Sequence, residues 1–290
     1  MAAPDPDLLA LNTATVRQRW SLGEIIAGCA RHRIRGIAPW YDQVRQLGLK
    51  DSAQRIRDAG LTVTGYCRAG LFPALDSKAR RALRDDNRRA VDEALELRAQ
   101  CLIVVAGGLP KTPDGVVASK DLPGAREMVR DGLGELLDYA RSGGMPLAIE
   151  PAHPMLAAER ACINTIAQAN DLCDELAGKN KGDGLGIAVD VYHVWWDPNL
   201  KQEIERAANA SPSRLLAFQL SDWLVPTVDT AADRGMMGDG VIDIPLIRSW
   251  MEDAGYRGMQ EAEILSVNNW WKRDPDEVLL TCRHRHQSAC

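Results

Sequence analysis

Residues 185–197 read LGIAVDVYHVWWD, and the pattern of this stretch decides the fold. Leu185 to Val189 are apolar or glycine without polar alternation, as expected for a parallel strand covered on both faces. The run ends at an acid, Asp190, and the residues after it include His193 and several aromatic residues. Because an acid at the end of a buried strand is costly to desolvate, its position indicates that another group compensates its charge.

A short apolar run followed by an amphipathic stretch recurs along the whole chain. We expect strands at Leu8–Asn12, Gly36–Trp40, Leu61–Tyr66, Cys101–Ala106, Pro146–Glu150, Leu185–Asp190, Leu215–Leu220 and Met259–Leu265. Helical patterns lie between them, for example at Asp42–Asp58, Lys78–Arg98, Arg126–Ala140, Ile163–Leu176 and Asp276–Arg283. Gly60 and Gly255 stand between a predicted helix and the next strand, where left-handed helix ends are common.

Strands that alternate with helices in this way predict an α/β fold, a (β/α)8 TIM barrel formed by residues 1–290 as a single domain. A doubly wound open sheet is the alternative, but no Gly-x-Gly-x-x-Gly follows the first predicted strand. The GDGLG run at 182–186 precedes a strand and is interpreted as a turn. Asp197-Pro198 and Asp274-Pro275 each predict the start of a helix.

The composition excludes several classes of protein. The net charge of −5 and pI of about 5.6 provide no overall attraction for nucleic acid or anionic lipid, so neither is expected as a partner. No apolar run is long enough to cross a membrane, and the start, MAAPDPDLL, lacks the features of a signal peptide. The 7 cysteines contain no Cys-x-x-Cys, which predicts reduced thiols and a cytoplasmic protein.

Polar residues stand at or near the ends of four consecutive predicted strands, the fifth to the eighth. They are Glu150, Asp190, Gln219 and Glu263. In TIM barrels the chemistry takes place where the strands end. Three carboxylates converging there would repel one another without a cation, and with an amide oxygen they form an oxygen cage that suits Mn²⁺ or Mg²⁺ better than Zn²⁺. Each acid taken alone could instead cap a helix or pair with an arginine.

Five segments together resemble a known family: LAIEP (147–151), VDVYHVWWD (189–197), FQLSDW (218–223), RGMMGDG (234–240) and EAEILSVNNWW (261–271). They resemble the sugar phosphate isomerase/epimerase family of xylose-isomerase-like barrels, closely from the sixth strand onward and more loosely before it. The resemblance implies a divalent metal, usually manganese, bound by Glu150, Asp190, Gln219 and Glu263, and proton exchange between the two glutamates and the substrate. Glu261 competes with Glu263 for the last ligand position, and the family more often has histidine at the position of Gln219.

Other residues near the strand ends are candidates for substrate contact. His193, three residues after Asp190, is expected to bond a substrate oxygen or to shuttle a proton, with a structural role as the alternative. His153 has the same spacing from Glu150, and its functional and structural interpretations are equally open. Arg234 stands where the resembling proteins have an arginine over the substrate, and a guanidinium there offers paired hydrogen bonds to an alkoxide, carboxylate or phosphate.

Tryptophan is frequent in this chain, with 8 residues against 2 phenylalanines. Several follow the last three predicted strands: Trp195, Trp196, Trp223, Trp270 and Trp271. We expect the apolar face of a sugar or glycoside to stack on Trp195, Trp196, Trp223 and Trp271. The alternative is a subunit interface, where tryptophan is also enriched, so a homo-oligomer or hetero-oligomer is expected.

These features predict a divalent-metal-dependent sugar isomerase or epimerase that removes a proton alpha to a carbonyl and passes through an enediolate. A lyase or dehydratase acting by β-elimination on 3-oxo-glycosides or inososes, with or without a partner subunit, is the alternative. A non-catalytic binding subunit is a third hypothesis, which the two candidate glutamates oppose. Hydrolytic DNA repair needs several zinc-binding histidines and a basic surface, whereas this chain is acidic and has 5 histidines in all.

Overall fold

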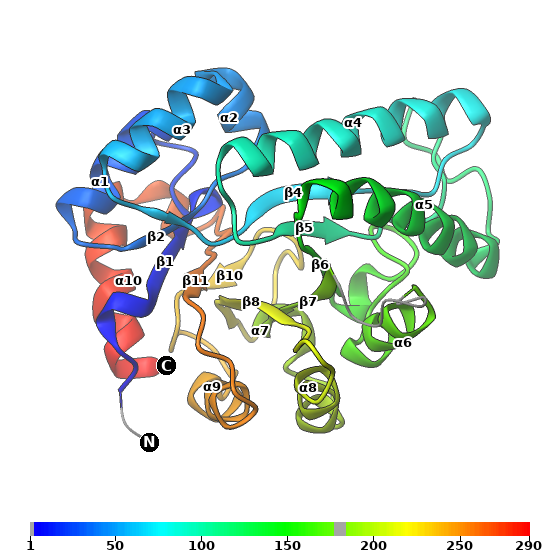
Figure 1. Ribbon diagram of the computed structural model, residues 1–290. Coiled ribbons are helices and arrows are strands. Elements are labelled where there is room, and N and C mark those ends of the chain that lie inside the picture. Colours follow the sequence, from blue (N-terminus) through cyan, green and yellow to red (C-terminus); the bar gives the residue numbers. More distant parts are fainter. Residues whose placement is uncertain (1–2, 177–183) are drawn as a thin grey trace.

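In the computed structural model, which describes residues 3–176 and 184–290, parallel strands form a barrel that helices surround (Figure 1). The barrel strands are β1 (Leu9–Asn12), β2 (Gly36–Ala38), β3 (Thr62–Val63), β4 (Tyr66–Gly70), β5 (Leu102–Val105), β6 (Leu147–Glu150), β7 (Leu185–Asp190), β8 (Leu215–Leu220) and β11 (Gln260–Ala262). A separate antiparallel pair consists of β9 (Asp222–Trp223) and β10 (Arg234–Gly235).

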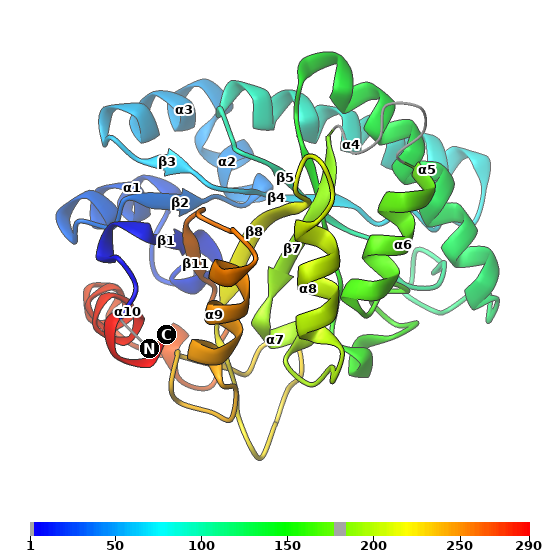
Figure 2. The same cartoon turned by 60° about the horizontal axis from the view of Figure 1, so that its bottom comes forward.

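The helices cover the outside of the barrel, with α8 and α9 side by side along β7 and β8 (Figure 2). The α-helices are α1 (Leu22–Arg31), α2 (Tyr41–Leu47), α3 (Leu49–Asp58), α4 (Ser77–Glu96), α5 (Leu122–Gly143), α6 (Ile166–Leu176), α7 (Val191–Val194), α8 (Leu200–Ala208), α9 (Ile244–Asp253) and α10 (Pro275–Ala289). Short 3₁₀ helices are η1 (Pro6–Leu8), η2 (Thr13–Thr15), η3 (Pro154–Leu156) and η4 (Trp270–Lys272). The predicted α/β TIM barrel is confirmed.

The barrel closes through a strand that is interrupted in its middle. The order of the sheet is β3-β2-β1-β11-β8-β7-β6-β5-β4, so β3 and β4 stand at its two ends. They are consecutive in the chain and replace the single strand predicted at Leu61–Tyr66. The amide of Thr64 donates to the Ile37 carbonyl at 3.0 Å, and that of Tyr66 donates to the Cys101 carbonyl at 3.0 Å. The two halves therefore bridge β2 and β5, and the strand order returns to its start.

Glycine sets two of the differences between prediction and structure. A Cβ on Gly65, between β3 and β4, would lie 3.2 Å from Glu261 Oε1, so the missing side chain leaves room for that carboxyl inside the barrel. Gly48 has φ +99° and separates α2 from α3 within the stretch predicted as one helix, Asp42–Asp58.

The helix start predicted at Asp274-Pro275 is confirmed, because the Asp274 side chain caps α10. The helix start predicted at Asp197-Pro198 is displaced, since α8 begins at Leu200.

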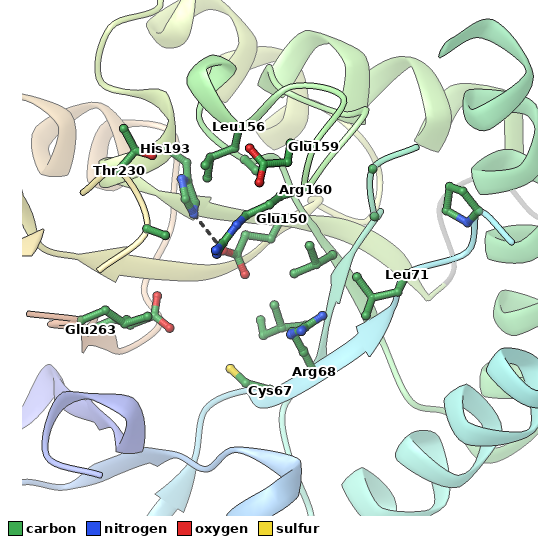
Figure 3. Close-up of a pocket in the computed structure, with 18 of the residues that line it drawn as sticks. Cys67, Arg68, Leu71, Glu150, Leu156, Glu159, Arg160, His193, Thr230 and Glu263 are labelled. Carbon is green, nitrogen blue, oxygen red and sulfur yellow. Dashed lines mark ion pairs between the residues drawn. The ribbon is translucent and has the colours of Figure 1, made fainter. Parts of the chain in front are cut away.

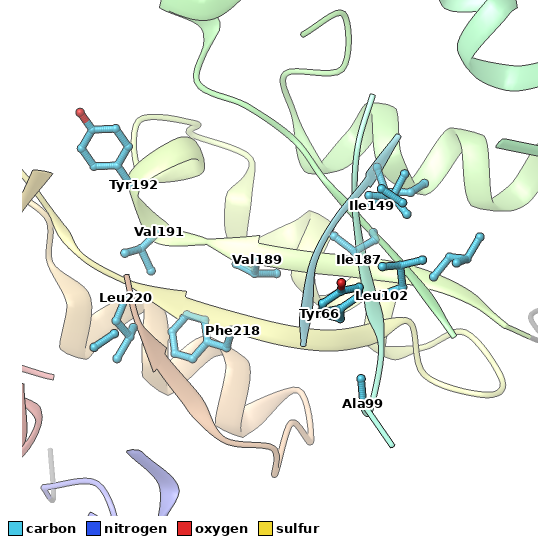
Figure 4. Packing of buried hydrophobic residues seen from close by; sticks show 14 of the residues in the cluster. Tyr66, Ala99, Leu102, Ile149, Ile187, Val189, Val191, Tyr192, Phe218 and Leu220 are labelled. Carbon is cyan, nitrogen blue, oxygen red and sulfur yellow. The ribbon is translucent and has the colours of Figure 1, made fainter. Parts of the chain in front are cut away.

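Most of the apolar core lies between the strands and the helices. Residues on β6, β7 and β8 that belong to this outer cluster include Ile149, Ile187, Val189, Phe218 and Leu220 (Figure 4). They are each at most 2% exposed, as expected for parallel strands whose outer face is covered by helices.

A second, smaller cluster fills the inside of the barrel below its mouth. It includes three alanines of consecutive strands, Ala148, Ala188 and Ala217. Since successive side chains of a strand point to opposite faces, the residue two positions after each alanine also points inward. Those residues are Glu150, Asp190 and Gln219, so the alternation of the strands directs them into the barrel.

Two further observations bear on expectations from composition. Among the described residues, no helix combines the length and apolarity required to cross a bilayer. All 7 cysteines are free thiols and all are buried, in agreement with the expectation of reduced thiols.

Candidate functional site

A cavity of about 550 Å³ opens at the carboxyl ends of the barrel strands (Figure 3). Glu150 from β6, His193 from α7, Arg234 from β10 and Glu263, which directly follows β11, all line it. The cavity thus brings together residues that are far apart in the sequence, at the end of the barrel where catalytic groups of this fold are found. Its volume is within the range of small-molecule sites, roughly 300–1,000 Å³.

Arg234 joins two of the carboxylates. Its Nη1 donates to Asp190 Oδ2 at 2.8 Å and to Glu263 Oε2 at 3.0 Å, and its guanidinium lies 4.5 Å from the ring centroid of Tyr192. Although burial disfavours the charge of Arg234, Asp190 and Glu263 hold its pKa above the usual value. Asp190 also accepts a hydrogen bond from the amide of Tyr192 at 2.9 Å through Oδ1. It therefore both caps α7 and pairs with an arginine, the two roles that are possible for a lone acid.

The two glutamates at the cavity are difficult to ionise in this arrangement. Burial raises the pKa of Glu150 well above its usual 4.5, and the charges of Glu263 and Asp190 raise it further. Burial also raises the pKa of Glu263, to about 7, although the neighbouring Arg234 opposes this. Two carboxyl groups with raised pKa values in one cavity are suited to exchange protons near neutral pH.

Both ring nitrogens of His193 are approached by groups that can only donate a hydrogen bond. The amide of His153 lies 3.1 Å from Nδ1, and Arg234 Nη2 lies 3.2 Å from Nε2. Burial lowers the pKa of His193 to about 3, so the ring is neutral at pH 7. Nε2 lies 3.5 Å from Glu150 Oε1 and 3.6 Å from Asp190 Oδ2. A neutral imidazole accepts at only one nitrogen, so His193 accepts from either the His153 amide or Arg234 and carries its proton on the other nitrogen.

Gln219 and Glu261 lie together inside the barrel as register partners on β8 and β11. Asp190 is the register partner of Gln219 on the other side, on β7. The side-chain oxygen of Gln219 is buried without a hydrogen-bond partner among the described residues. Burial raises the pKa of Glu261 to about 8, although side-chain hydrogen bonds with Thr64 and Gln219 oppose this. Of the two competing glutamates, Glu263 lines the cavity, whereas the described cavity wall does not include Glu261.

These donors fit a divalent metal ion. Glu150, Asp190 and His193 each have a potential ligand atom, and these atoms lie within 4.8 Å of one another. The oxygen of the Gln219 amide, beside Asp190, has no hydrogen-bond partner among the described residues, and buried polar groups normally have one. An ion coordinated by the Gln219 oxygen would give this buried oxygen a partner and would offset the repulsion between the carboxylates.

The remaining predicted residues form a layer around this cavity rather than its described wall. His153 stacks on Trp223 with centroids 4.2 Å apart, and burial lowers its pKa to about 4. Trp196 lies edge-on to His153 and donates from Nε1 to the His193 carbonyl at 2.9 Å. Trp195 packs near Trp223, with centroids 6.0 Å apart. These aromatic rings pack around α7, which carries His193.

Trp271 lies apart from this aromatic group and donates from Nε1 to the Ala14 carbonyl at 2.9 Å. The tryptophan in the described cavity wall is Trp40, which follows β2, and Arg68 and Arg160 line the same cavity. Sequence reasoning missed these three residues. Trp40 ends a predicted strand and could have been found by that criterion, whereas Arg68 lies in the middle of β4 and Arg160 in a loop, so neither gives that signal.

The sequence pattern of the xylose isomerase-like TIM barrel family matches residues 24–281. The chain belongs to this family. The resemblance stated from the sequence is therefore confirmed, and with it the barrel fold. Comparison with curated proteins found no match.

Several solved structures are similar to this chain over almost its whole length. The protein SMc04130 from Sinorhizobium meliloti 1021 is 50% identical, with a TM-score of 0.92 and coverage of 99% of both chains. The IolI protein with a bound zinc atom is 18% identical, with a TM-score of 0.78 and coverage of 97% of each chain. The D-allulose 3-epimerase from Methylomonas sp. is 19% identical, with a TM-score of 0.74 and coverage of 100% of each chain. The last two likenesses concern the fold.

Proposed function

We propose that this protein is a divalent-metal-dependent sugar isomerase or epimerase, with Mn²⁺ as its ion and a sugar or glycoside as its substrate. One observation carries the proposal. Glu150 and Glu263 line one cavity as largely buried carboxyl groups of raised pKa, next to His193 and a cation, Arg234. Membership of a family with an epimerase among its solved relatives supports the same conclusion.

Four residues would hold the ion: Glu150, Asp190, Gln219 and Glu263. Their oxygen atoms favour Mn²⁺ or Mg²⁺ over Zn²⁺, which prefers nitrogen and sulfur ligands. When bound, such an ion polarises a substrate carbonyl and so acidifies the adjacent C–H.

The protein's own residues move the proton. One of the two glutamates removes the proton alpha to the substrate carbonyl, and the other returns a proton to the enediolate. Return to the opposite face gives an epimer, and return to the neighbouring carbon interconverts aldose and ketose. His193 Nε2 lies 3.5 Å from Glu150 Oε1, and the imidazole lines the cavity where it would contact a substrate oxygen. Arg234 holds one oxygen of Glu263 and so fixes the orientation of this carboxylate.

Hydrogen exchange in D₂O tests the proposal. The enzyme, loaded with Mn²⁺, is incubated in D₂O with D-fructose, D-allulose and a 3-oxo-glucoside, and deuterium at the carbon alpha to the carbonyl is followed by NMR. We expect exchange with at least one substrate and loss of exchange by several orders of magnitude in Glu150→Gln and Glu263→Gln. Glu127→Gln, an exposed change on α5, is the matched control and should retain the wild-type rate.

Three results would count against the proposal. Release of a β-substituent with the α-hydrogen exchanged would show a lyase in place of an isomerase. Turnover with complete retention of the original hydrogen would show hydride transfer or hydrolysis. Absence of exchange and of bound metal, with every substrate, would show a binding protein.

A further inference from the structure

Two arginines of the cavity wall play no part in the chemistry proposed above. Arg68 lies on β4, and Arg160 lies in the loop between η3 and α6 (Figure 3). Within residues 3–176 and 184–290, neither side chain has a hydrogen bond or an ion pair, although Arg234 in the same cavity has several. The charge of Arg68 lowers the pKa of Glu150, but the two groups do not form an ion pair.

The surroundings of Arg68 make an unpaired charge unfavourable. Arg68 is half-buried, and the apolar side chains of Leu71, Ile103 and Val105 line the cavity with it. A guanidinium in such a place loses hydration and gains a partner only from what enters the cavity. Arg160 is more exposed, so water compensates its charge to a larger extent.

The overall charge of the cavity leads to the same conclusion. Four cations, Arg68, Lys111, Arg160 and Arg234, face four carboxylates: Glu150, Glu159 and Glu263 in the wall and Asp190 behind Arg234. These charges balance when the four carboxylates are ionised, and Glu261, inside the barrel beside Gln219, adds one negative charge when it also ionises. A bound divalent ion would leave an excess of one or two positive charges, which a neutral sugar does not compensate but a carboxylate or phosphate does.

We infer that Arg68, assisted by Arg160, forms a subsite for an oxyanion on the substrate, so that the protein acts on an acidic sugar, either a sugar carboxylate or a sugar phosphate. The planar guanidinium of Arg68 offers two parallel N–H donors to a pair of oxyanion oxygens. The assignment of the substrate as a sugar rests on the proposed function, whereas the affinity for an oxyanion rests on the cavity wall alone.

Equilibrium binding of matched polyols tests the subsite. The ligands are D-glucitol, D-gluconate and D-glucitol 6-phosphate, measured by calorimetry with the Mn²⁺-loaded protein. We expect one or both charged ligands to bind roughly 10- to 100-fold more tightly than D-glucitol, the value of a charge-assisted hydrogen bond. Gluconate and the phosphate distinguish the two kinds of oxyanion.

Substitutions test whether Arg68 is responsible for the preference for charged ligands. Arg68→Gln should remove most of the preference for the charged ligand, measured at saturating Mn²⁺ as the ratio of its affinity to that of D-glucitol. Arg160→Gln should have a smaller effect, because Arg160 is exposed. Arg81→Gln removes an equal charge from the outer surface of α4 and should change nothing.

The outcomes separate this inference from the proposed function. Equal affinity for neutral and charged ligands in the wild type would overturn the subsite, even if hydrogen exchange on a neutral sugar confirmed the isomerase. An equal loss of affinity for all three ligands in Arg68→Gln would show a purely structural role and would also overturn it. Oxyanion selectivity that depends on Arg68, without any hydrogen exchange, would support the subsite and reject the isomerase.

Discussion

Removal of Arg234 should destabilise the metal-free protein, because this arginine is the cation between two buried carboxylates. The side chains are 6% exposed for Arg234, 0% for Asp190 and 4% for Glu263. Loss of one partner from a buried ion pair costs about 3–5 kcal/mol, since the remaining charges stay desolvated. For a chain of this size each kcal/mol shifts the Tm by roughly 2–4 °C. We therefore expect Arg234→Gln to unfold about 6–20 °C below the wild type at pH 8.

The effect should depend on pH in one direction. The pKa of Glu263 is already raised to about 7 and rises further without Arg234, so the folded variant takes up a proton more readily than the unfolded chain. Stability contributed by a group with a raised pKa is present at low pH and is lost as the pH rises through the folded value. The difference between variant and wild type should accordingly be smaller at pH 5.5 than at pH 8.

Scanning calorimetry in EDTA at both pH values, with Arg81→Gln as the control, measures this effect. Addition of Mn²⁺ should raise the Tm of Arg234→Gln by more than that of the wild type, because the ion supplies the missing positive charge without competition from Arg234. Equal Tm values for Arg234→Gln and wild type in EDTA at pH 8 would refute the reasoning. So would a destabilisation of the same size at both pH values.

Two more predictions concern the layer below the cavity. Glu261→Gln should stabilise the metal-free protein by about 3–5 kcal/mol at pH 8.5 and have little effect at pH 4.5, because the folded pKa of Glu261 is about 8 against the usual 4.5. Urea unfolding at the two pH values measures this difference in stability. A difference that does not depend on pH would contradict the prediction. Gln219→His should shift the metal preference from Mn²⁺ toward Zn²⁺ by about tenfold, since imidazole suits zinc. Competition between the two ions, followed by elemental analysis, tests this prediction. An unchanged preference would show that residue 219 is not a ligand.

Local patterns in the sequence were sufficient for the barrel and for the strand-end polar residues. Apolar runs of strand length that alternate with helical patterns require a parallel sheet covered on both faces, and this requirement does not depend on distant residues. The step of two residues from Ala148 to Glu150 and from Ala188 to Asp190 then directs both acids inward. Boundaries were less certain where one glycine acts, as at Gly48, because a positive φ is a property of the folded backbone.

Only the tertiary structure decided how the charges are paired. Arg234 is 44 residues from Asp190 and 29 from Glu263 in the chain, and closure of the barrel brings all three together. The two ring nitrogens of His193 likewise contact the amide of a residue 40 positions away and a guanidinium 41 positions away. Electrostatic energies depend on distances in space and on burial, whereas sequence patterns record only order and periodicity. The sequence therefore determined which residues reach the mouth of the barrel, and the fold determined which of them neutralise one another and which, such as Arg68, are left for a ligand.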